Sequence, residues 1–259
     1  MISVIIPTLN TPTALDLCLK SAIDGQQQQN EIIVVVDGDF NTNKEVLSKY
    51  SLYIKPLILD KNVGTCKATN FGVYNAMHKS LLIVNDDNVF PSGWDQILSK
   101  LDLSNSVVAP NQIEPYNSIF RQFHIRDLGR DPASFDLEKF WQYELSIRKN
   151  MIEYTGSTFP ILIDKFNYLR CGGFDSDYPS PSGFVADWEF FMKCEMNGLK
   201  MIRTYQCMFY HFVSVTAKTP EKMIAAQKFE QDCHAYFKYK WGSLAKHNPQ
   251  NNSKLLKDN

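Results

Sequence analysis

The sequence has no long apolar run and no segment that resembles an export signal. No stretch of about 18 apolar residues occurs, so we expect no membrane-spanning helix. The first residues, MISVIIP, show no basic segment followed by a long apolar one, so we also expect no signal peptide. The six cysteines are scattered and form no CxxC pair, which favours reduced thiols and a cytoplasmic protein.

The chain also lacks a large net charge of either sign. The 27 Lys and Arg residues face 28 Asp and Glu residues, which gives a formal net charge of −1. Nucleic-acid binding depends on an excess of Lys and Arg, so we expect no nucleic-acid partner. The balance is uneven along the chain, because residues 218–259 hold eight Lys against four acidic residues. A basic tail therefore follows a mildly acidic body.

Two glycine-rich nucleotide signatures are absent as well. There is no GxGxxG after the first strand-like run and no GxxxxGK[ST] anywhere in the chain. The first absence argues against an NAD-dependent oxidoreductase and the second against a P-loop protein. A nucleotide would be held here by carboxylates and a metal ion instead of a glycine loop.

The first half does contain an alternation of strand-like and helix-like segments. Residues 32–36 are five consecutive β-branched residues, typical of a central parallel strand buried on both faces. Further strands are predicted at 3–7, 52–59, 81–84 and 107–109, and helices at 12–25, 65–78 and 92–101. This order predicts an α/β fold with a mostly parallel central sheet flanked by helices.

The second half is less regular. Residues 113–150 are polar and aromatic, with a helix expected at 136–149. Apolar periodicity predicts further helices at 165–170, 187–197 and 221–239, and strands at 161–163 and 200–211.

Acidic and amide side chains follow the predicted parallel strands. Asp37 and Asp39 come after the second strand, and Asp86, Asp87 and Asn88 come after the fourth. Ligands of open α/β sheets sit outside the carboxyl ends of the strands, so these side chains should converge. One Asp-rich strand end can be an ordinary turn, but successive ends favour a site. Adjacent carboxylates repel unless a cation neutralises them, and oxygen ligands suit Mg²⁺ or Mn²⁺.

Seven short motifs run through residues 1–217. They are Pro7-Thr8-Leu9-Asn10, the strand 34–39, Asn62-Val63-Gly64 with Ala68, Asn70 and Gly72, Asn85-Asp86-Asp87, Gly172-Gly173-Phe174-Asp175, Asp187-Trp188-Glu189 with Lys193, and His211-Phe212-Val213-Ser214. In this order they resemble the motifs of family 2 glycosyltransferases of the GT-A fold, a Rossmann-like architecture. The resemblance implies a nucleotide-sugar donor and a divalent metal ion.

The resemblance also implies a role for each position. The donor would be bound by Pro7, Thr8, Asn10, Asp37, Asp39, Gly64, Asn70 and Asp86, with Thr8 and Asp37 at the base. Asp87 and His211 would bind Mn²⁺ or Mg²⁺ at the diphosphate. For His211, at the end of an apolar strand, a buried structural histidine is the alternative interpretation.

Asp187 is the candidate catalytic base. An acceptor hydroxyl becomes a better nucleophile when a carboxylate removes its proton as it attacks. Trp188 and Glu189 would contact the acceptor by the same resemblance. Relatives usually carry Glu before this Asp, whereas this chain has Ala186. An Asp that favours a helix N-terminus is a compatible interpretation of Asp187.

These features predict a metal-dependent, inverting glycosyltransferase that uses a nucleotide sugar, expected to be a UDP-sugar. The Q-x-x-R-W motif of processive members is missing, so we expect one sugar per encounter. The acceptor would be a hydroxyl of a glycan, a lipid-linked sugar or another molecule. A catalytically inactive nucleotide-sugar-binding module and a sugar nucleotidyltransferase are the alternatives.

The predicted division has three parts. Residues 1–112 would form the nucleotide-sugar-binding half of one GT-A domain, and residues 113–217 its acceptor and catalytic half, or acceptor-side subdomain. Residues 218–259 would form a C-terminal amphipathic helix and a polar tail. Packing of this helix on the body is the favoured interpretation, and weak contact of Lys238, Lys240 and Lys246 with an anionic membrane is the alternative.

Overall fold

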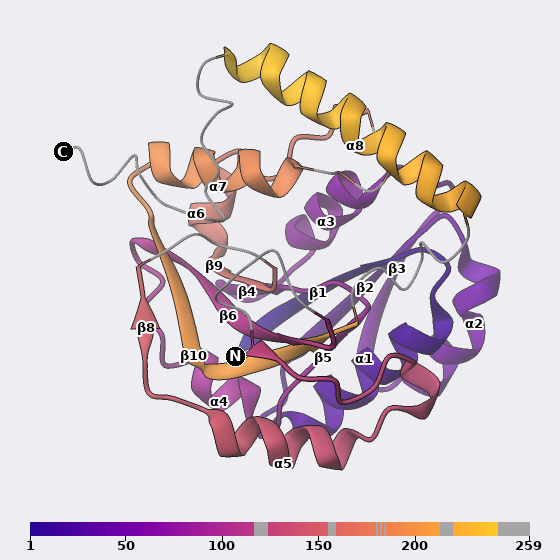
Figure 1. Ribbon diagram of the computed structural model, residues 1–259, viewed down its shortest axis with the longest axis vertical. Coiled ribbons are helices and arrows are strands. Elements are labelled where there is room, and N and C mark those ends of the chain that lie inside the picture. Colours follow the sequence, from indigo (N-terminus) through magenta and orange to yellow (C-terminus); the bar gives the residue numbers. More distant parts are fainter. Residues whose placement is uncertain are drawn as a thin grey trace.

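Helices cover both faces of a central sheet in the computed structural model of the chain (Figure 1). The structure describes residues 1–116, 124–154, 159–179, 181, 183, 185–212 and 220–242. The strands are β1 (Ile2–Thr8), β2 (Glu31–Asp37), β3 (Ile54–Leu59), β4 (Ser80–Ile83), β5 (Asn88–Val89), β6 (Ser106–Glu114), β7 (His124–Ile125), β8 (Ile152–Glu153), β9 (Ile161–Asp164) and β10 (Lys200–His211). The helices are α1 (Pro12–Gly25), α2 (Phe40–Lys49), α3 (Thr65–Tyr74), α4 (Trp94–Leu98), α5 (Leu137–Ile147), α6 (Lys165–Arg170), α7 (Ala186–Met196) and α8 (Pro220–Trp241), with a 3₁₀ turn at Pro132–Ser134.

The sheet is mostly parallel, as the sequence predicts. Its strands lie in the order β3-β2-β1-β4-β9-β6-β10-β5, with β7 beside β6 and β8 beside β10. The first four run parallel to one another, and β6 runs parallel to β10. Strand β9 is antiparallel to both β4 and β6 and joins the two parallel groups. The predicted α/β class is confirmed.

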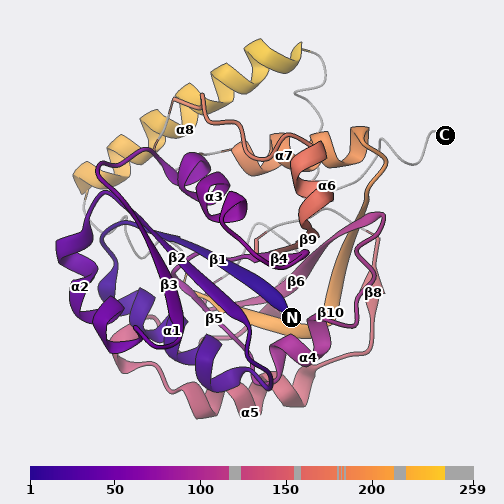
Figure 2. The ribbon, with the colours of Figure 1, turned by 180° about the vertical axis from the view of Figure 1, so that it is seen from behind.

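Two hydrophobic cores lie on opposite faces of this sheet. In β1, Ile5 packs with α3 and α7, whereas Val4 and Ile6 pack with α1 and α4. Period-2 alternation of apolar residues on both faces is what a strand covered by helices requires. Figure 2 shows α3, α6, α7 and α8 on one side and α1, α2, α4 and α5 on the other. All six cysteines are buried and unbridged.

Several elements differ from their predicted extents. Helix α2 is not predicted, because its segment FNTNKEVLSK is largely polar and buries only Asn43 and Leu47. Strand β6 continues five residues beyond the predicted end at Ala109, since its polar residues Asn111, Gln112 and Glu114 are buried beside β10. Helix α3 ends at Tyr74 instead of residue 78. The predicted strand 200–211 and helix 165–170 have the observed bounds.

In the part of the chain that the structure describes, none of the helices has the length and apolar character needed to cross a bilayer. Helix α8 confirms the predicted C-terminal helix and packs Cys233 and Phe237 into the core beside α3 and α7. Lys246, one of the lysines of the membrane alternative, lies outside the described residues.

Candidate functional site

Several predicted site residues follow the carboxyl ends of β1, β2 and β4. From β1 the chain proceeds to β2 and β3 on one side and then returns to β4 on the other. Such a reversal of strand order opens a crevice at the carboxyl ends of the strands, where α/β proteins bind ligands. Thr8 ends β1 and Asp37 ends β2, while Asp86 and Asp87 follow β4. These strand ends therefore lie at one edge of the sheet, because β1, β2 and β4 run parallel.

Asp86 is tied directly to the segment after β1. Its Oδ2 accepts a hydrogen bond from the Thr11 hydroxyl, which lies 3.4 Å from that of Thr8. Burial, together with the negative charge of Asp87, raises the pKa of Asp86 to about 6, although the threonine hydroxyls oppose the shift. Two adjacent carboxylates in a shielded crevice favour a bound cation.

His211 lies between two carboxylates. Its Nε2 is 3.5 Å from Oδ2 of Asp87, and its Nδ1 is 2.9 Å from Oε1 of Glu114. Burial disfavours the charged ring, but the two carboxylates outweigh burial and raise the pKa of His211 to about 10. Antiparallel pairing of β10 with β5 places His211 opposite Asn88, directly after Asp87. Two segments far apart in the sequence thus bring the predicted metal ligands together.

These residues fit a partial metal site. A metal-binding histidine usually directs its second ring nitrogen to a carboxylate, and Glu114 occupies that position. Among the described residues there is no group of three or more His, Cys, Asp and Glu side chains that could enclose an ion by themselves. Mg²⁺ and similar ions are commonly held by one or two side chains plus substrate phosphates and water. Asp87 and His211 suit such an ion, with further ligands supplied by a bound diphosphate.

Asp37 organises the loop between β3 and α3. Its carboxylate accepts hydrogen bonds from the backbone N–H groups of Val63 (2.7 Å) and Gly64 (2.9 Å). Burial raises the pKa of Asp37, while these two hydrogen bonds oppose the rise. Gly38 has φ +90°, and a Cβ there would lie 2.2 Å from the Asn62 nitrogen. The close approach of the two loops thus requires glycine at position 38.

The remaining predicted donor residues occupy different surroundings. Asp39 caps α2 by accepting from the Thr42 N–H and hydroxyl. Pro7 is buried within β1, and Asn10 is exposed at the rim of the crevice. The Asn70 side chain instead hydrogen-bonds to Tyr168 of α6 and to Phe174 and Ser176 in the segment that follows α6. A donor contact by Asn70 stays a prediction.

Asp187 lies in the first turn of α7, near the start of α3. The negative charge of Asp187, after burial, contributes to raising the pKa of Cys66 in α3 to about 12. The Thr65 N–H donates to the Pro181 carbonyl at 2.7 Å, which ties the two helix starts together. Val185, just before α7, has φ +56°. A β-branched residue in this region is strained, and such strain concentrates at functional sites.

Glu189 lies in a buried ionic cluster that includes α8. Its side chain is 0% exposed, and its Oε1 is 2.6 Å from Lys240 Nζ and 3.7 Å from Lys193 Nζ. Lys240 also contacts Asp175 at 2.7 Å. Trp188 packs edge-on against His234 of α8 at 5.3 Å. Both predicted acceptor residues thus face the C-terminal helix.

Glu114, Thr11 and Lys240 were not identified from the sequence as parts of these clusters. The strand predicted at 107–109 stops short of Glu114, which belongs to the longer β6. Thr11 directly precedes α1, yet its side chain makes no capping hydrogen bond and donates to Asp86. Lys240 is one of the lysines of the membrane alternative, and its ion pairs instead favour the predicted packing of α8 on the body.

Comparisons with known proteins agree with this architecture. The profile of the family described as Glycosyl transferase family 2 matches residues 3–172. No curated protein matches the chain. The crystal structure of S. aureus TarS 1–349 superposes with a TM-score of 0.57 at 14% identity, covering 92% of this chain and 65% of that one. The same TarS fragment in complex with UDP gives 0.55 at 12% identity, with coverage of 92% and 65%.

A second solved structure is a mannosyltransferase, PcManGT from Pyrobaculum calidifontis, in complex with GDP-Man and Mn²⁺. Its TM-score is 0.57 at 14% identity, and the match covers 95% of this chain and 77% of that chain. By comparison, the match to TarS 1–349 spans just under two thirds of the length of that chain. Identities this low establish a common fold, whereas function is determined by the site.

Proposed function

Since the chain belongs to glycosyl transferase family 2 and has the GT-A fold, we propose that it transfers a sugar from a nucleotide-sugar donor to an acceptor hydroxyl. The donor is a UDP-sugar, the reaction needs Mn²⁺ or Mg²⁺, and the anomeric configuration is inverted. TarS has been solved in complex with UDP and with UDP-GlcNAc, which supports the choice of UDP. Each acceptor receives one sugar per encounter, because the processive Q-x-x-R-W motif is absent from the sequence.

The observation that carries this proposal is the 3.5 Å approach of Asp87, which follows β4, to His211, which ends β10. Asp87 and His211 would hold the divalent ion, and Glu114 fixes the orientation of the histidine ring. When bound, the ion neutralises the negative charge that develops on the diphosphate leaving group. The acidic crevice would otherwise repel a diphosphate.

The protein's own residues position the two reactants. Asp37 holds the loop at Val63 and Gly64 against the crevice, which shapes the wall facing the nucleotide. Asp187 accepts the proton of the acceptor hydroxyl as its oxygen attacks the anomeric carbon. The new C–O bond forms as the bond to the diphosphate breaks, and the nucleoside diphosphate departs. A single displacement of this kind inverts the anomeric centre.

A donor-turnover assay tests the proposal. The chain is incubated with a panel of UDP- and GDP-sugars and simple glycoside acceptors, with Mn²⁺ or with EDTA, and nucleotide release is followed. We expect slow hydrolysis or transfer from a UDP-sugar with Mn²⁺ only, and a product of inverted configuration by NMR. Binding without any turnover would support the inactive module instead. Release of pyrophosphate from a nucleoside triphosphate plus a sugar phosphate would support a nucleotidyltransferase.

A further inference from the structure

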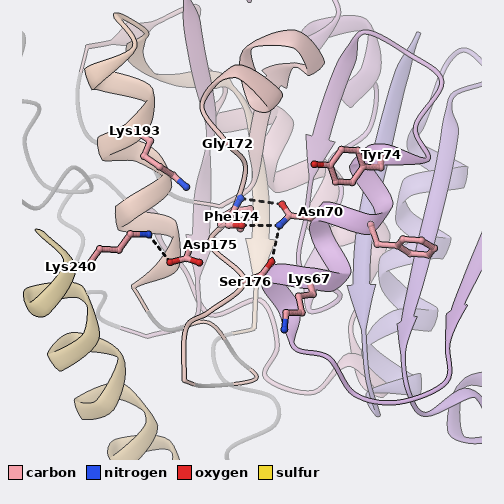
Figure 3. A pocket seen from close by; sticks show the side chains of 10 residues that line it. Lys67, Asn70, Tyr74, Gly172, Phe174, Asp175, Ser176, Lys193 and Lys240 are labelled. Carbon is pink, nitrogen blue, oxygen red and sulfur yellow. Dashed lines mark hydrogen bonds and ion pairs between the residues drawn. The ribbon is translucent and has the colours of Figure 1, made fainter.

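A second recessed site lies on the outer surface of α3, away from the acidic crevice. Figure 3 shows this pocket, with a volume of about 590 Å³, between α3, the segment 172–176, α7 and the end of α8. One wall is formed by Lys67, Asn70, Phe71 and Tyr74 of α3. Their spacing of three, four and seven residues places them on one face of the helix. The opposite face of α3 packs Ala68 and Val73 into the core.

The pocket collects ammonium groups from three helices. Lys67 comes from α3, Lys193 from α7 and Lys240 from α8, while Asp175 is the acidic residue that lines it. Lys240 binds the carboxylates of both Asp175 and the buried Glu189. The three lysines outnumber these two carboxylates, so the five side chains together carry a net charge of +1.

Within the described residues, neither of the other two lysines has a carboxylate oxygen closer than 3.7 Å. Lys193 donates to the Gly173 carbonyl at 2.6 Å, and its nearest carboxylate oxygen, at 3.7 Å, is the one that Lys240 contacts at 2.6 Å. Burial lowers the pKa of Lys193, while the negative charge of Glu189 opposes the shift. Within the described part of the chain, Lys67 is exposed and makes no hydrogen bond or ion pair. An anion entering the pocket would gain two ammonium partners.

Aromatic surface adjoins these charges. Phe71 is 39% exposed and Tyr74 is 70% exposed on the same stripe of α3 as Lys67. Binding sites for small molecules combine apolar and aromatic walls with a few placed polar groups, and exposed apolar patches often mark such grooves. Aromatic rings beside ammonium groups suit a ring-shaped ligand with an apolar face and a negative substituent.

We propose that this pocket binds an anionic saccharide unit, carrying a carboxylate or a phosphate, in the part of the acceptor that does not react. This inference deepens the proposed function and rests on it, because the ligand is an acceptor only if the chain transfers a sugar. Lys67 lies three residues beyond Gly64, about 4.5 Å along α3, and Lys193 lies six residues beyond Asp187, about 9 Å along α7. These short distances along the helices would let an extended acceptor reach from the pocket toward the starts of α3 and α7. The diphosphate of the donor belongs to the acidic crevice, where a cation is needed; the basic pocket needs none.

Binding of defined saccharides to the full chain, in EDTA and without nucleotide, tests the inference. The probes are trigalacturonic acid, its neutral trimethyl ester and mannose 6-phosphate, titrated by NMR or calorimetry. We expect trigalacturonate or the sugar phosphate to bind, and trigalacturonate to bind at least about fivefold more tightly than its ester. Added salt should reduce the difference, since exposed charges are screened. Binding of the phosphate alone would identify phosphate as the charged group; failure of both anions to bind would overturn the inference.

Point variants locate the binding. Lys67→Met should weaken binding of the anion about threefold to fivefold, the range of an exposed ion pair. Tyr74→Ala should weaken binding of acid and ester alike. Lys238→Met and Tyr239→Ala, exposed on α8 outside the pocket lining, are the matched controls and should change neither. An equal loss in Lys67→Met and Lys238→Met would overturn the assignment.

Failure of the inference can be told apart from failure of the proposed function. Saccharide binding in EDTA and donor turnover with Mn²⁺ are measured separately, because neither Asp87 nor Asp187 lines the pocket. Saccharide binding without any donor turnover would support the proposed pocket and contradict the proposed enzymatic function. Donor turnover without preferential binding of anionic saccharides would support the enzymatic function and contradict the pocket.

Discussion

At the residue scale, the same kind of side chain serves different purposes according to its neighbours. The carboxylate of Asp37 accepts hydrogen bonds from two backbone N–H groups, and that of Asp39 accepts from the start of α2. The carboxylate of Asp86 accepts from a threonine hydroxyl. Asp87 instead faces His211, and Asp187 lies half-exposed at the start of α7. The chemistry of the proposed reaction is therefore concentrated in Asp87, His211 and Asp187.

Asp187→Asn tests the proposed base. The amide has nearly the same shape but does not accept a proton at neutral pH. We expect turnover of the donor to fall at least about a hundredfold, as is usual on loss of a general base. Affinity for the donor, measured by calorimetry, should change little. Full activity in this variant would assign the base to another carboxylate, with Asp175 and Glu189 next in order.

Glu114→Gln tests the orientation of His211. The glutamine keeps the volume of the side chain but removes the charge that faces Nδ1 of the ring. Loss of a carboxylate that orients a metal-binding histidine typically lowers the metal affinity about 10–100-fold. Titration of Mn²⁺ in the presence of UDP measures the change. Asp24→Asn, in an exposed pair with Lys20, is the control and should have no effect. Unchanged Mn²⁺ affinity in Glu114→Gln would separate Glu114 from the site.

At the element scale, α8 is anchored to α7 and to the segment after α6 by ionic and ring contacts. Lys240 bridges Asp175 and Glu189, the Tyr236 hydroxyl donates to Asp175 at 3.1 Å, and His234 packs on Trp188. The match to the family profile ends at residue 172, so both α7 and α8 lie beyond it. The C-terminal helix thereby becomes part of the surroundings of the proposed acceptor site.

Lys240→Met should destabilise the fold. The change removes the closest cation from Glu189, whose side chain is 0% exposed. Breaking a fully buried pair costs about 3–5 kcal/mol, and we expect about 2 kcal/mol because Lys193 remains nearby. Urea denaturation measures the loss, with Lys238→Met as the control. The double variant Lys240→Met/Glu189→Gln should recover most of the stability; a double variant as unstable as the single one would contradict this account.

The contact of α5 with β10 predicts a pH dependence of stability. Glu144 is buried and accepts from Arg148 Nε at 2.6 Å and from the Met208 N–H at 2.9 Å, where β10 changes register. Burial, only partly offset by Arg148, raises the pKa of Glu144 from 4.5 to about 7. The folded chain therefore keeps this proton at pH values where the unfolded chain has lost it.

This contribution to stability is complete below pH 4.5 and is lost as the pH rises through about 7. Glu144→Gln stays neutral throughout, so its stability should fall less over the same range. Urea denaturation of both proteins between pH 5 and pH 8 makes the comparison. Identical pH profiles for the two would show that Glu144 is already ionised at the lower end.

At the scale of the whole molecule, the order of strands and helices follows from the sequence, whereas several contacts do not. Apolar periodicity predicts β1, β2 and β10 because each is buried among helices or other strands. Helix α2 is not predicted because its sequence is polar and lacks an apolar stripe. Asp39 caps its start, and the Asn43 side chain donates to the Leu9 carbonyl. Glu114 and Lys240 are placed by pairing of β6 with β10 and by docking of α8, which no local pattern encodes. The division at residues 112 and 217 stays a prediction, as does a cytoplasmic location.

The measurement that most directly tests the central claim is thermal unfolding of the chain with UDP, with Mn²⁺, and with both. If UDP is held through an ion on Asp87 and His211, the two together should stabilise the fold far more than either alone. Ligand at about one hundred times its Kd would add about 2.7 kcal/mol. Asp87→Ala should abolish this joint stabilisation while unfolding normally without ligand. Equal stabilisation by UDP in EDTA and in Mn²⁺, or full stabilisation of Asp87→Ala, would contradict the account.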